Sequence, residues 1–321
     1  MIRARAATWL RALRVNQWTK NALVFMAWCF AFADDSQAAM ARGWHPFFLV
    51  AAMAGSFCLL SSAFYLLNDV SDCDADRRHP VKCRRPVAAG LISKEDAVRA
   101  ALALFACAMA YPSYLVFRHP DRTWGFAVIL IYVVIQSLYS GVLKRIPYVD
   151  VAVIAIGFVL RAVAGAAATA VRISPWLLAC SFVLSLFLAL CKRRHEMAVA
   201  ADSRTALKHY NPLALNIRIF ISAVATFCVY ACYTLAPDTV ARFHTRALSL
   251  TAGFVGLGVA RYLVLVYSKA DVGRPEKILL SDRRMWLILL GYVAAAVFAA
   301  YLGRTGGASA FTETFRQHGV S

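Results

Sequence analysis

The chain has 321 residues, of which 61% are hydrophobic and only 16% are charged, a composition that excludes a soluble globular domain and predicts a polytopic membrane protein. Most of the formal net charge of +18 is assigned to cations that mark topology and contact anionic lipid headgroups. Nucleic acid is excluded as a partner, because the basic segments are short loops without a nucleic-acid-binding motif. The nine cysteines form no CxxC pair, which argues against a zinc site or disulfides.

Recurring apolar stretches predict an all-α fold of nine transmembrane helices in a single transmembrane domain over residues 1–321. Most stretches approach the ~20 residues that a helix needs to cross the hydrocarbon. The expected spans are 22–40, 47–67, 98–117, 124–142, 150–170, 175–191, 217–236, 247–267 and 285–303. Asp34 and Asp35 interrupt the first span, and the Arg-rich residues before it with Ala31-Phe32-Ala33 also imitate a cleavable signal peptide.

Lys and Arg residues in the loops predict the orientation. The N-terminal segment and alternate loops carry 24 of them, against eight on the opposite side. Because cytoplasmic loops hold the excess of cations, the N-terminus and the loops 68–96, 142–149 and 192–216 are expected in the cytoplasm, and the C-terminus across the cell membrane. A cytosolic phosphorylated substrate would then reach these loops, which are expected to form the active-site face.

A cluster of oxygen-bearing side chains follows the second predicted span. Four of them fall within one arc of roughly a quarter turn on a helix; they are Asn68, Asp69, Asp72 and Asp76. Such a face suits Mg²⁺, with Mn²⁺ as an alternative metal, held together with substrate phosphate oxygens. The alternative is a solvated loop whose acids balance the cations that follow. Among those cations, Arg77, Lys82 and Arg85 are expected to bind an anionic substrate, whereas Asp74 points away and is expected to matter less.

Further candidate residues lie at the end of the fourth predicted span and within the fifth. Tyr139 and Lys144 lie at the end of the fourth span and are candidates for binding substrate. The alternative is that Tyr139 belongs to an aromatic belt and Lys144 only marks topology. The Lys144 ammonium suits a phosphate or a departing pyrophosphate. Asp150 would complete a second metal site or hold Lys144. Arg161 lies roughly mid-membrane, about 11 residues into the fifth span, where a charge is costly. It is expected to line a cavity and contact phosphate, with a structural ion pair as the alternative.

Two basic segments complete the candidate site. Lys192, Arg193 and Glu196 close the sixth predicted span and are candidates for binding substrate, against the alternative of topology marking. Lys20 and Asn21 end an amphipathic N-terminal segment that also contains Arg14, Gln17 and Trp18. That segment is either part of the site or an interfacial anchor.

Four segments resemble the UbiA superfamily of intramembrane prenyltransferases, and within it the decaprenyl-phosphate phosphoribosyltransferases. They are LRVNQWTKN at 13–21, LNDVSDCDADRRHPVKCRRPVAAG at 67–90, LYSGVLKRIPYVDVAVIAIGFVLRAVAGA at 138–166 and CKRRHE at 191–196. The resemblance implies nine helices around a central cavity open to the cytoplasm. The chain departs from members that prenylate aromatic rings, because the segment after the sixth span lacks a second DxxxD motif and is rich in cations.

The resemblance also implies substrates: 5-phosphoribosyl 1-diphosphate as donor and a polyprenyl phosphate as acceptor, giving a lipid-linked precursor of arabinosyl donors for cell-wall or surface glycans. Asp72, Asp76 and Lys144 would be catalytic, and membrane lipids would surround the protein. One alternative is an aromatic prenyltransferase that uses isoprenyl diphosphate, and another is a transporter or flippase for an anionic lipid. The sequence leaves the isoprenoid length open, and also whether the chain forms a homo-oligomer.

Overall fold

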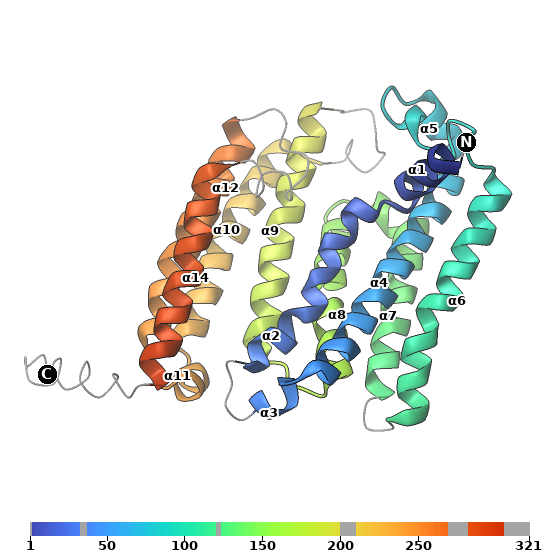
Figure 1. Ribbon diagram of the computed structural model, residues 1–321. Coiled ribbons are helices and arrows are strands. Elements are labelled where there is room, and N and C mark those ends of the chain that lie inside the picture. Colours follow the sequence, from blue (N-terminus) through green and yellow to red (C-terminus); the bar gives the residue numbers. More distant parts are fainter. Residues whose placement is uncertain (1, 33–36, 120–122, 200–209, 269–281, 305–321) are drawn as a thin grey trace, which may run out of the picture. The chain divides into compact units, whose positions relative to one another are not determined.

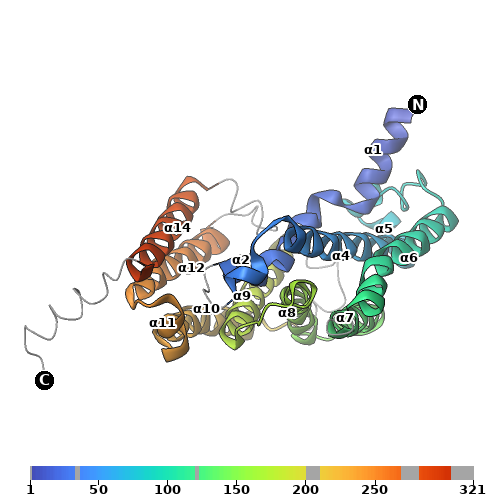
Figure 2. The ribbon, with the colours of Figure 1, turned by 60° about the horizontal axis from the view of Figure 1, so that its bottom comes forward.

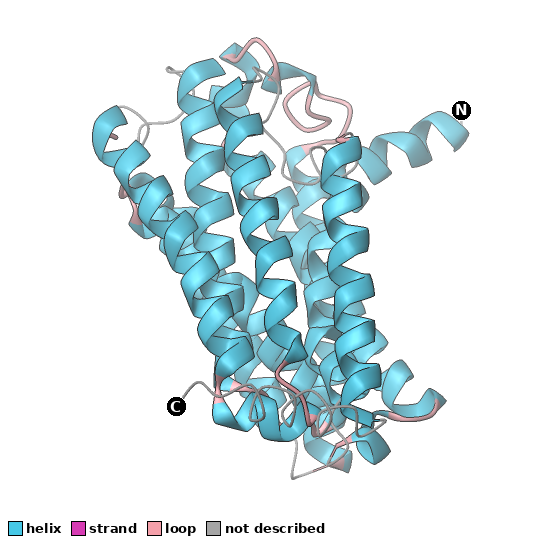
Figure 3. Cartoon of the chain, turned by 90° about the vertical axis from the view of Figure 1, so that its left-hand side faces the viewer, coloured by secondary structure: helices cyan, strands magenta, loops and turns pink. Residues whose placement is uncertain are grey.

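The computed structural model describes residues 2–32, 37–119, 123–199, 210–268 and 282–304. Every regular element within these ranges is helical (Figure 3), as the sequence predicted. Eight helices are long and apolar enough to cross a membrane, which agrees with an integral multi-pass membrane protein. They are Trp44–Ser71, Lys94–Arg118, Thr123–Gly141, Val149–Thr169, Pro175–Met197, Pro212–Leu235, Ala247–Ser268 and Arg283–Gly303.

The segment predicted as the first span does not form one continuous α-helix over its described residues, so the eight long helices match the other eight of the nine predicted spans. Val15–Phe25 is a 3₁₀-helix, η1, followed by the α-helices α2, Met26–Phe32, and α3, Ala38–Ala41. A 3₁₀-helix rises ~2.0 Å per residue, so η1 and α2 together extend about 32 Å, enough to cross the ~30 Å hydrocarbon core. The physical reason for the irregularity lies in side-chain contacts that recur every three residues, described below.

The chain divides into two compact units. The first unit comprises residues up to Phe32 and Gln37–Ile173, and Figure 1 shows its long helices α4, α6, α7 and α8 running alongside one another. Besides η1, α2 and α3, its elements are α1 (Ile2–Leu13), α4 (Trp44–Ser71), α5 (Cys73–Arg78), η2 (Lys82–Arg84), α6 (Lys94–Arg118), α7 (Thr123–Gly141), η4 (Leu143–Arg145) and α8 (Val149–Thr169).

The second unit begins at Ser174 and contains the remaining spans. Its elements are α9 (Pro175–Val199), α10 (Pro212–Leu235), α11 (Pro237–Phe243), η6 (Ala247–Ser249), α12 (Leu250–Ser268) and α14 (Arg283–Arg304). Asn211 caps α10 by accepting bonds from two backbone N–H groups, and Pro212 follows at the first helical position, which is its favoured place. The predicted loop 192–216 is therefore shorter than expected, because α9 and α10 extend into it from both sides.

Arg261, a charged residue within α12, pairs with Asp282 in the second unit. Its two guanidinium nitrogens lie 3.2 Å and 2.6 Å from the carboxylate oxygens. Asp282 also accepts a bond from the backbone N–H of Met285 at the start of α14. The ion pair thus connects α12 to the N-terminus of α14, where a negative charge is favoured.

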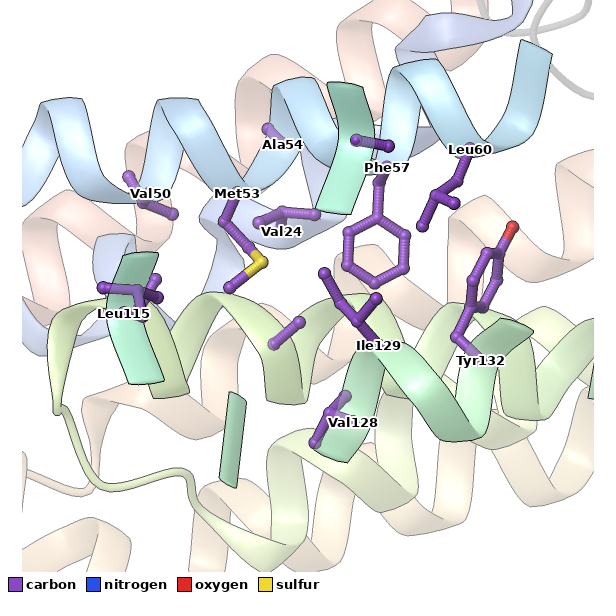
Figure 4. Packing of buried hydrophobic residues seen from close by; sticks show 13 residues of the cluster. Val24, Val50, Met53, Ala54, Phe57, Leu60, Leu115, Val128, Ile129 and Tyr132 are labelled. Carbon is purple, nitrogen blue, oxygen red and sulfur yellow. The ribbon is translucent and has the colours of Figure 1, made fainter. Parts of the chain in front are cut away.

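The core of the first unit is centred on α4 (Figure 4). Phe57 and Met53 of α4 pack with Ile129 and Tyr132 of α7, and Val24 of η1 joins the same cluster. A second cluster lies at the end of α4 that carries the acidic motif, where Trp9 and Leu13 of α1 pack beside residues from the segment after α5. The second cluster fixes the segments on either side of the motif, while the N-terminal half of α1 extends away from the other helices (Figure 2).

Gly165 of α8 allows η1 to approach closely. A Cβ at this position would lie 1.7 Å from the carbonyl oxygen of Val24. We therefore expect Gly165→Ala to destabilise the protein by about 3 kcal/mol, because backbone atoms must move to remove the overlap. The control is Gly55→Ala, where a Cβ would meet nothing within 4 Å. Thermal unfolding in detergent would distinguish them, and equal melting temperatures would contradict this close packing.

Candidate active site

The acidic motif lies where α4 passes into α5. Asn68 and Asp69 belong to the last turn of α4, Asp72 links the two helices, and Asp76 lies in α5. The backbone N–H of Asp72 bonds to the carbonyl of Asn68 at 2.9 Å, and that of Asp76 to the carbonyl of Asp72 at 2.8 Å. The helical path therefore continues across the link, as the predicted spacing required.

Two arginines form ion pairs with the buried carboxylates of the motif. Asp69 is 1% exposed and Asp76 is 3% exposed. Arg85 bridges them, with one nitrogen 3.2 Å from Asp69 and 2.7 Å from Asp76, and Arg14 donates to the same oxygen of Asp69. These four residues, Arg14, Asp69, Arg85 and Asp76, form an alternating chain that we call the guanidinium–carboxylate cluster. Buried carboxylates require polar or charged partners, and the two arginines supply them here.

Arg14 is held in place from several directions. It occupies the left-handed region, with φ of 52°, at the junction between α1 and η1. Its guanidinium lies 4.5 Å from the ring centroid of Tyr65, a cation–π contact. Burial lowers the pKa of Arg14 from its ordinary value, and the charge of Asp69 opposes that shift. The backbone strain and the desolvation of Arg14 are thus offset by partners on α4.

Asp72 has a different environment. The side chain is 41% exposed, and the Lys144 ammonium of η4 lies 3.2 Å and 3.3 Å from its two oxygens. Asn68, one turn earlier on α4, is half-buried. Amide and carboxylate oxygens are the ligands that Mg²⁺ prefers, so Asn68 and Asp72 fit a magnesium ion. No group of three or more Asp, Glu, His or Cys side chains within the described ranges is arranged to hold a metal alone, so phosphate oxygens would have to complete the coordination.

The η1 segment presents two faces because a 3₁₀-helix has three residues per turn. On one face, Gln17 accepts hydrogen bonds from Lys20 at 3.0 Å and from Tyr65 at 2.9 Å. On the other, Trp18 donates to Ser62 of α4 at 3.0 Å, and Asn21, 2% exposed, follows three residues later. The predicted candidates Lys20 and Asn21 therefore lie on different faces, and only Lys20 remains half-exposed.

Arg161 is bound by neutral partners. Its guanidinium donates to Asn21 at 2.8 Å, to the carbonyl of Gly157 at 2.7 Å and to Tyr132 at 2.9 Å. The rings of Phe57, Tyr132 and Phe158 lie 5.0–5.6 Å from it. No carboxylate within the described ranges pairs with Arg161, so the structural ion pair considered above is not formed there. Its positive charge remains available to an anion, and a phosphate contact stays a prediction.

The remaining candidates of the first unit lie on several elements. Arg77 donates to the carbonyl of Ala88 at 3.3 Å, and Lys82 and Tyr139 are half-buried. The imidazole of His79 accepts from the backbone N–H of Lys82 at 3.3 Å, and burial lowers the pKa of His79. A neutral imidazole can accept such a bond, so this turn holds Lys82 at the edge of the motif. Asp150 is buried in the first turn of α8.

Lys192, Arg193 and Glu196 belong to α9 of the second unit. Arg193 is 2% exposed and forms an ion pair with Glu196. The next residue, Arg194, lies 4.0 Å from the ring centroid of Tyr267 on α12. The basic end of α9 is therefore built into the second unit by paired and stacked side chains, and its role in binding substrate stays a prediction.

The sequence predicted Arg14, Gln17 and Trp18 only as parts of the amphipathic N-terminal segment, and it did not predict Tyr65 or Tyr132 as residues of the site. Arg14 and Gln17 precede Lys20 at intervals of three, and Trp18 precedes Asn21 by the same interval. That spacing is the available sequence signal for a 3₁₀-helix with two faces. Tyr65 and Tyr132 carried no comparable signal, because an aromatic residue in an apolar span is ordinary core.

Comparison with known proteins shows the family and the fold of the chain. The model of the UbiA prenyltransferase family matches residues 22–288. The chain belongs to the UbiA prenyltransferase family. This UbiA-family chain is 32% identical over 300 residues, 91% of its length and 86% of the relative, to the decaprenyl-phosphate phosphoribosyltransferase of Corynebacterium glutamicum. It is 30% identical to the protein of that name from Mycobacterium tuberculosis, over 92% of its own length and 94% of the relative.

The fold of this UbiA-family protein has solved counterparts. A UbiA homolog from Archaeoglobus fulgidus, determined with DMAPP and Mg²⁺ bound, aligns with a TM-score of 0.66 and 18% sequence identity. The alignment covers 92% of the present chain and 99% of the homolog. The fold is therefore that of an intramembrane UbiA transferase, and Mg²⁺ is bound by a protein of the same fold.

Proposed function

We propose that the protein transfers the 5-phosphoribosyl group of 5-phosphoribosyl 1-diphosphate to a polyprenyl phosphate of the decaprenyl type and releases pyrophosphate. The observation that carries the proposal is the similarity, over 91% of the chain, to an enzyme named decaprenyl-phosphate phosphoribosyltransferase. The product would be a lipid-linked precursor of arabinosyl donors for cell-wall or surface glycans. The excess of Lys and Arg in the N-terminal segment and alternate loops supports a reaction at the cytoplasmic face of the cell membrane.

The positively charged side chains of the first unit support the proposal that both substrates are phosphorylated. Lys144 and Arg85 lie against the acidic motif, Lys20 is half-exposed on η1, and Arg161 carries a charge that no carboxylate in the described residues neutralises. An aromatic acceptor with one carboxylate or none would leave this excess of cations poorly matched. A donor with three phosphate groups and an acceptor with one would give these cations several anionic groups to contact.

Asn68 and Asp72 would hold Mg²⁺, and Lys144 would lie beside the same carboxylate. When bound, Mg²⁺ would offset negative charge on the diphosphate oxygens. Lys144 would contribute a second positive charge near the pyrophosphate as it departs. The remaining two acids, Asp69 and Asp76, would act through Arg14 and Arg85, which they hold in fixed positions.

The proposed reaction exchanges one C–O bond for another. The bond between ribose C1 and the diphosphate breaks, and its electron pair leaves with pyrophosphate. An oxygen of the lipid phosphate forms the new bond to C1 from the opposite face. A polyprenyl phosphate is already an anion at neutral pH, so no protein side chain needs to remove a proton. The protein would supply orientation and positive charge.

The experiment is transfer of radiolabel from 5-phosphoribosyl 1-diphosphate to polyprenyl phosphate by the protein in detergent. We expect labelled lipid that requires a divalent cation and forms together with pyrophosphate. Chelation by EDTA should remove the activity, and added Mg²⁺ should restore it. Consumption of isoprenyl diphosphate with an aromatic acid, and no labelled lipid, would instead identify an aromatic prenyltransferase. Movement of unmodified lipid phosphate across a vesicle membrane, without labelled product, would identify a flippase.

A further inference from the structure

Two buried serine hydroxyl groups in the first unit have no hydrogen-bond partner among the described residues. They are the Oγ atoms of Ser61 on α4 and of Ser140 on α7, and no described residue bonds to either. Ser61 as a whole is only 9% exposed. Buried polar atoms of this kind are rare in folded proteins and cost free energy when they stay unsatisfied. Both therefore call for a partner that the polypeptide does not supply.

The position of Ser61 is fixed by contacts at both ends of its helix face. Phe57, Ser61, Asn68 and Asp72 fall within an arc of about 60° on α4. At one end, the ring of Phe57 lies 4.9 Å from the ring of Tyr132 on α7, and Figure 4 shows the two side by side. At the other, Asp72 binds Lys144 of η4. Ser61 thus lies along a face whose two ends meet α7 and the segment that follows it.

The corresponding stretch of α7 is also polar. Between Tyr132 and Lys144 it carries Gln136 and Ser140, both half-buried. Tyr132, Gln136 and Ser140 fall within an arc of about 80°. We call Ser61, Gln136 and Ser140 the neutral polar face. It lies between two cations along the helices, Arg161 beside Phe57 and Lys144 beside Asp72.

We propose that the neutral polar face binds the free hydroxyl groups of a phosphorylated pentose; this rests on the proposed function. The donor has phosphate groups at both ends and a ring with two free hydroxyls between them. That pattern matches cations at both ends of a neutral segment. An isoprenyl chain would leave the serine hydroxyls unsatisfied, so the same face selects against isoprenyl diphosphate.

The test compares 5-phosphoribosyl 1-diphosphate with its 2-deoxy and 3-deoxy analogues, using wild type, Ser61→Ala and Ser140→Ala. A serine that bonds a ribose hydroxyl should, when replaced, raise the KM of the natural donor roughly ten-fold, the effect of one lost hydrogen bond. The matching deoxy analogue should be affected less than about two-fold, because it lacks the partner group. The KM of polyprenyl phosphate should not change.

Matched controls are available on the same helices. Ser56→Ala and Ser137→Ala remove hydroxyls that already bond to carbonyls of their own helix, at 3.2 Å to Ala52 and 2.8 Å to Val133. Both should retain the wild-type preference for the natural donor. If Ser61→Ala and Ser140→Ala also retain that preference, or alter only the melting temperature, the proposal is wrong. If wild type transfers no phosphoribosyl group at all, the proposed function itself has failed.

Discussion

Replacing Asp72 by alanine is expected to lower phosphoribosyl transfer roughly 100-fold or more, because metal and leaving-group contacts of this kind carry effects of that size. Asp72 is the motif carboxylate with the greatest access to solvent and substrate, and it also binds Lys144. Because the pair is partly exposed, its loss should cost less than about 1 kcal/mol of stability. The measurements are initial rates over a range of Mg²⁺ concentrations, together with the melting temperature.

Asp74 provides the control for Asp72. It lies two residues away, its side chain is 71% exposed, and its cationic neighbours Arg77 and Lys94 are 3.6 Å and 3.5 Å distant. Asp74→Ala removes the same charge from the same segment and should leave transfer close to wild type. Equal activity of Asp72→Ala and Asp74→Ala would show that Asp72 has no role in transfer, and other residues would then have to hold the metal.

The sequence predicted the helical spans well because each of the eight is a simple consequence of length and hydrophobicity. It did not predict η1, because its conformation depends on partners distant in the chain. Trp18 bonds to Ser62, Asn21 bonds to Arg161, and Val24 lies against Gly165. A periodicity of three is weak by itself and becomes decisive only when α4 and α8 supply matching groups.

The sequence predicted which side chains of the acidic motif share one helix face, but it did not predict the neighbours that each side chain meets. Helical spacing placed Asn68, Asp69, Asp72 and Asp76 on one arc, so all four were predicted as metal ligands. Burial separates them, since Asp69 is 1% exposed while the side chain of Asp72 is 41% exposed. Spacing on a helix defines a direction but not the neighbours met in that direction, and Arg14 lies 55 residues earlier in the chain.

The guanidinium–carboxylate cluster gives the second large expected effect. Asp69→Asn should destabilise the protein by about 3 kcal/mol, because it leaves Arg14 and Arg85 without a buried counter-charge they share. The expected value is at the lower end for broken buried pairs, since the two arginine side chains are 20% and 29% exposed. Thermal or denaturant unfolding in detergent would measure it.

A double-mutant cycle distinguishes a positioning role for Asp69 from metal binding. Arg14→Gln removes the charge that Asp69→Asn leaves without its carboxylate partner, so the double variant with Asp69→Asn should be more stable than the sum of the single effects implies. If Asp69 acts through the arginines, the folded fraction of Asp69→Asn should show a raised KM for the phosphorylated donor and an unchanged Mg²⁺ dependence. If Asp69→Asn shifts the Mg²⁺ dependence of the rate and the cycle gives no interaction energy with Arg14, Asp69 is a metal ligand instead. In that case the arginines would have to rely on Asp76, which bonds Arg85 at 2.7 Å but has no contact of this kind with Arg14 among the described residues.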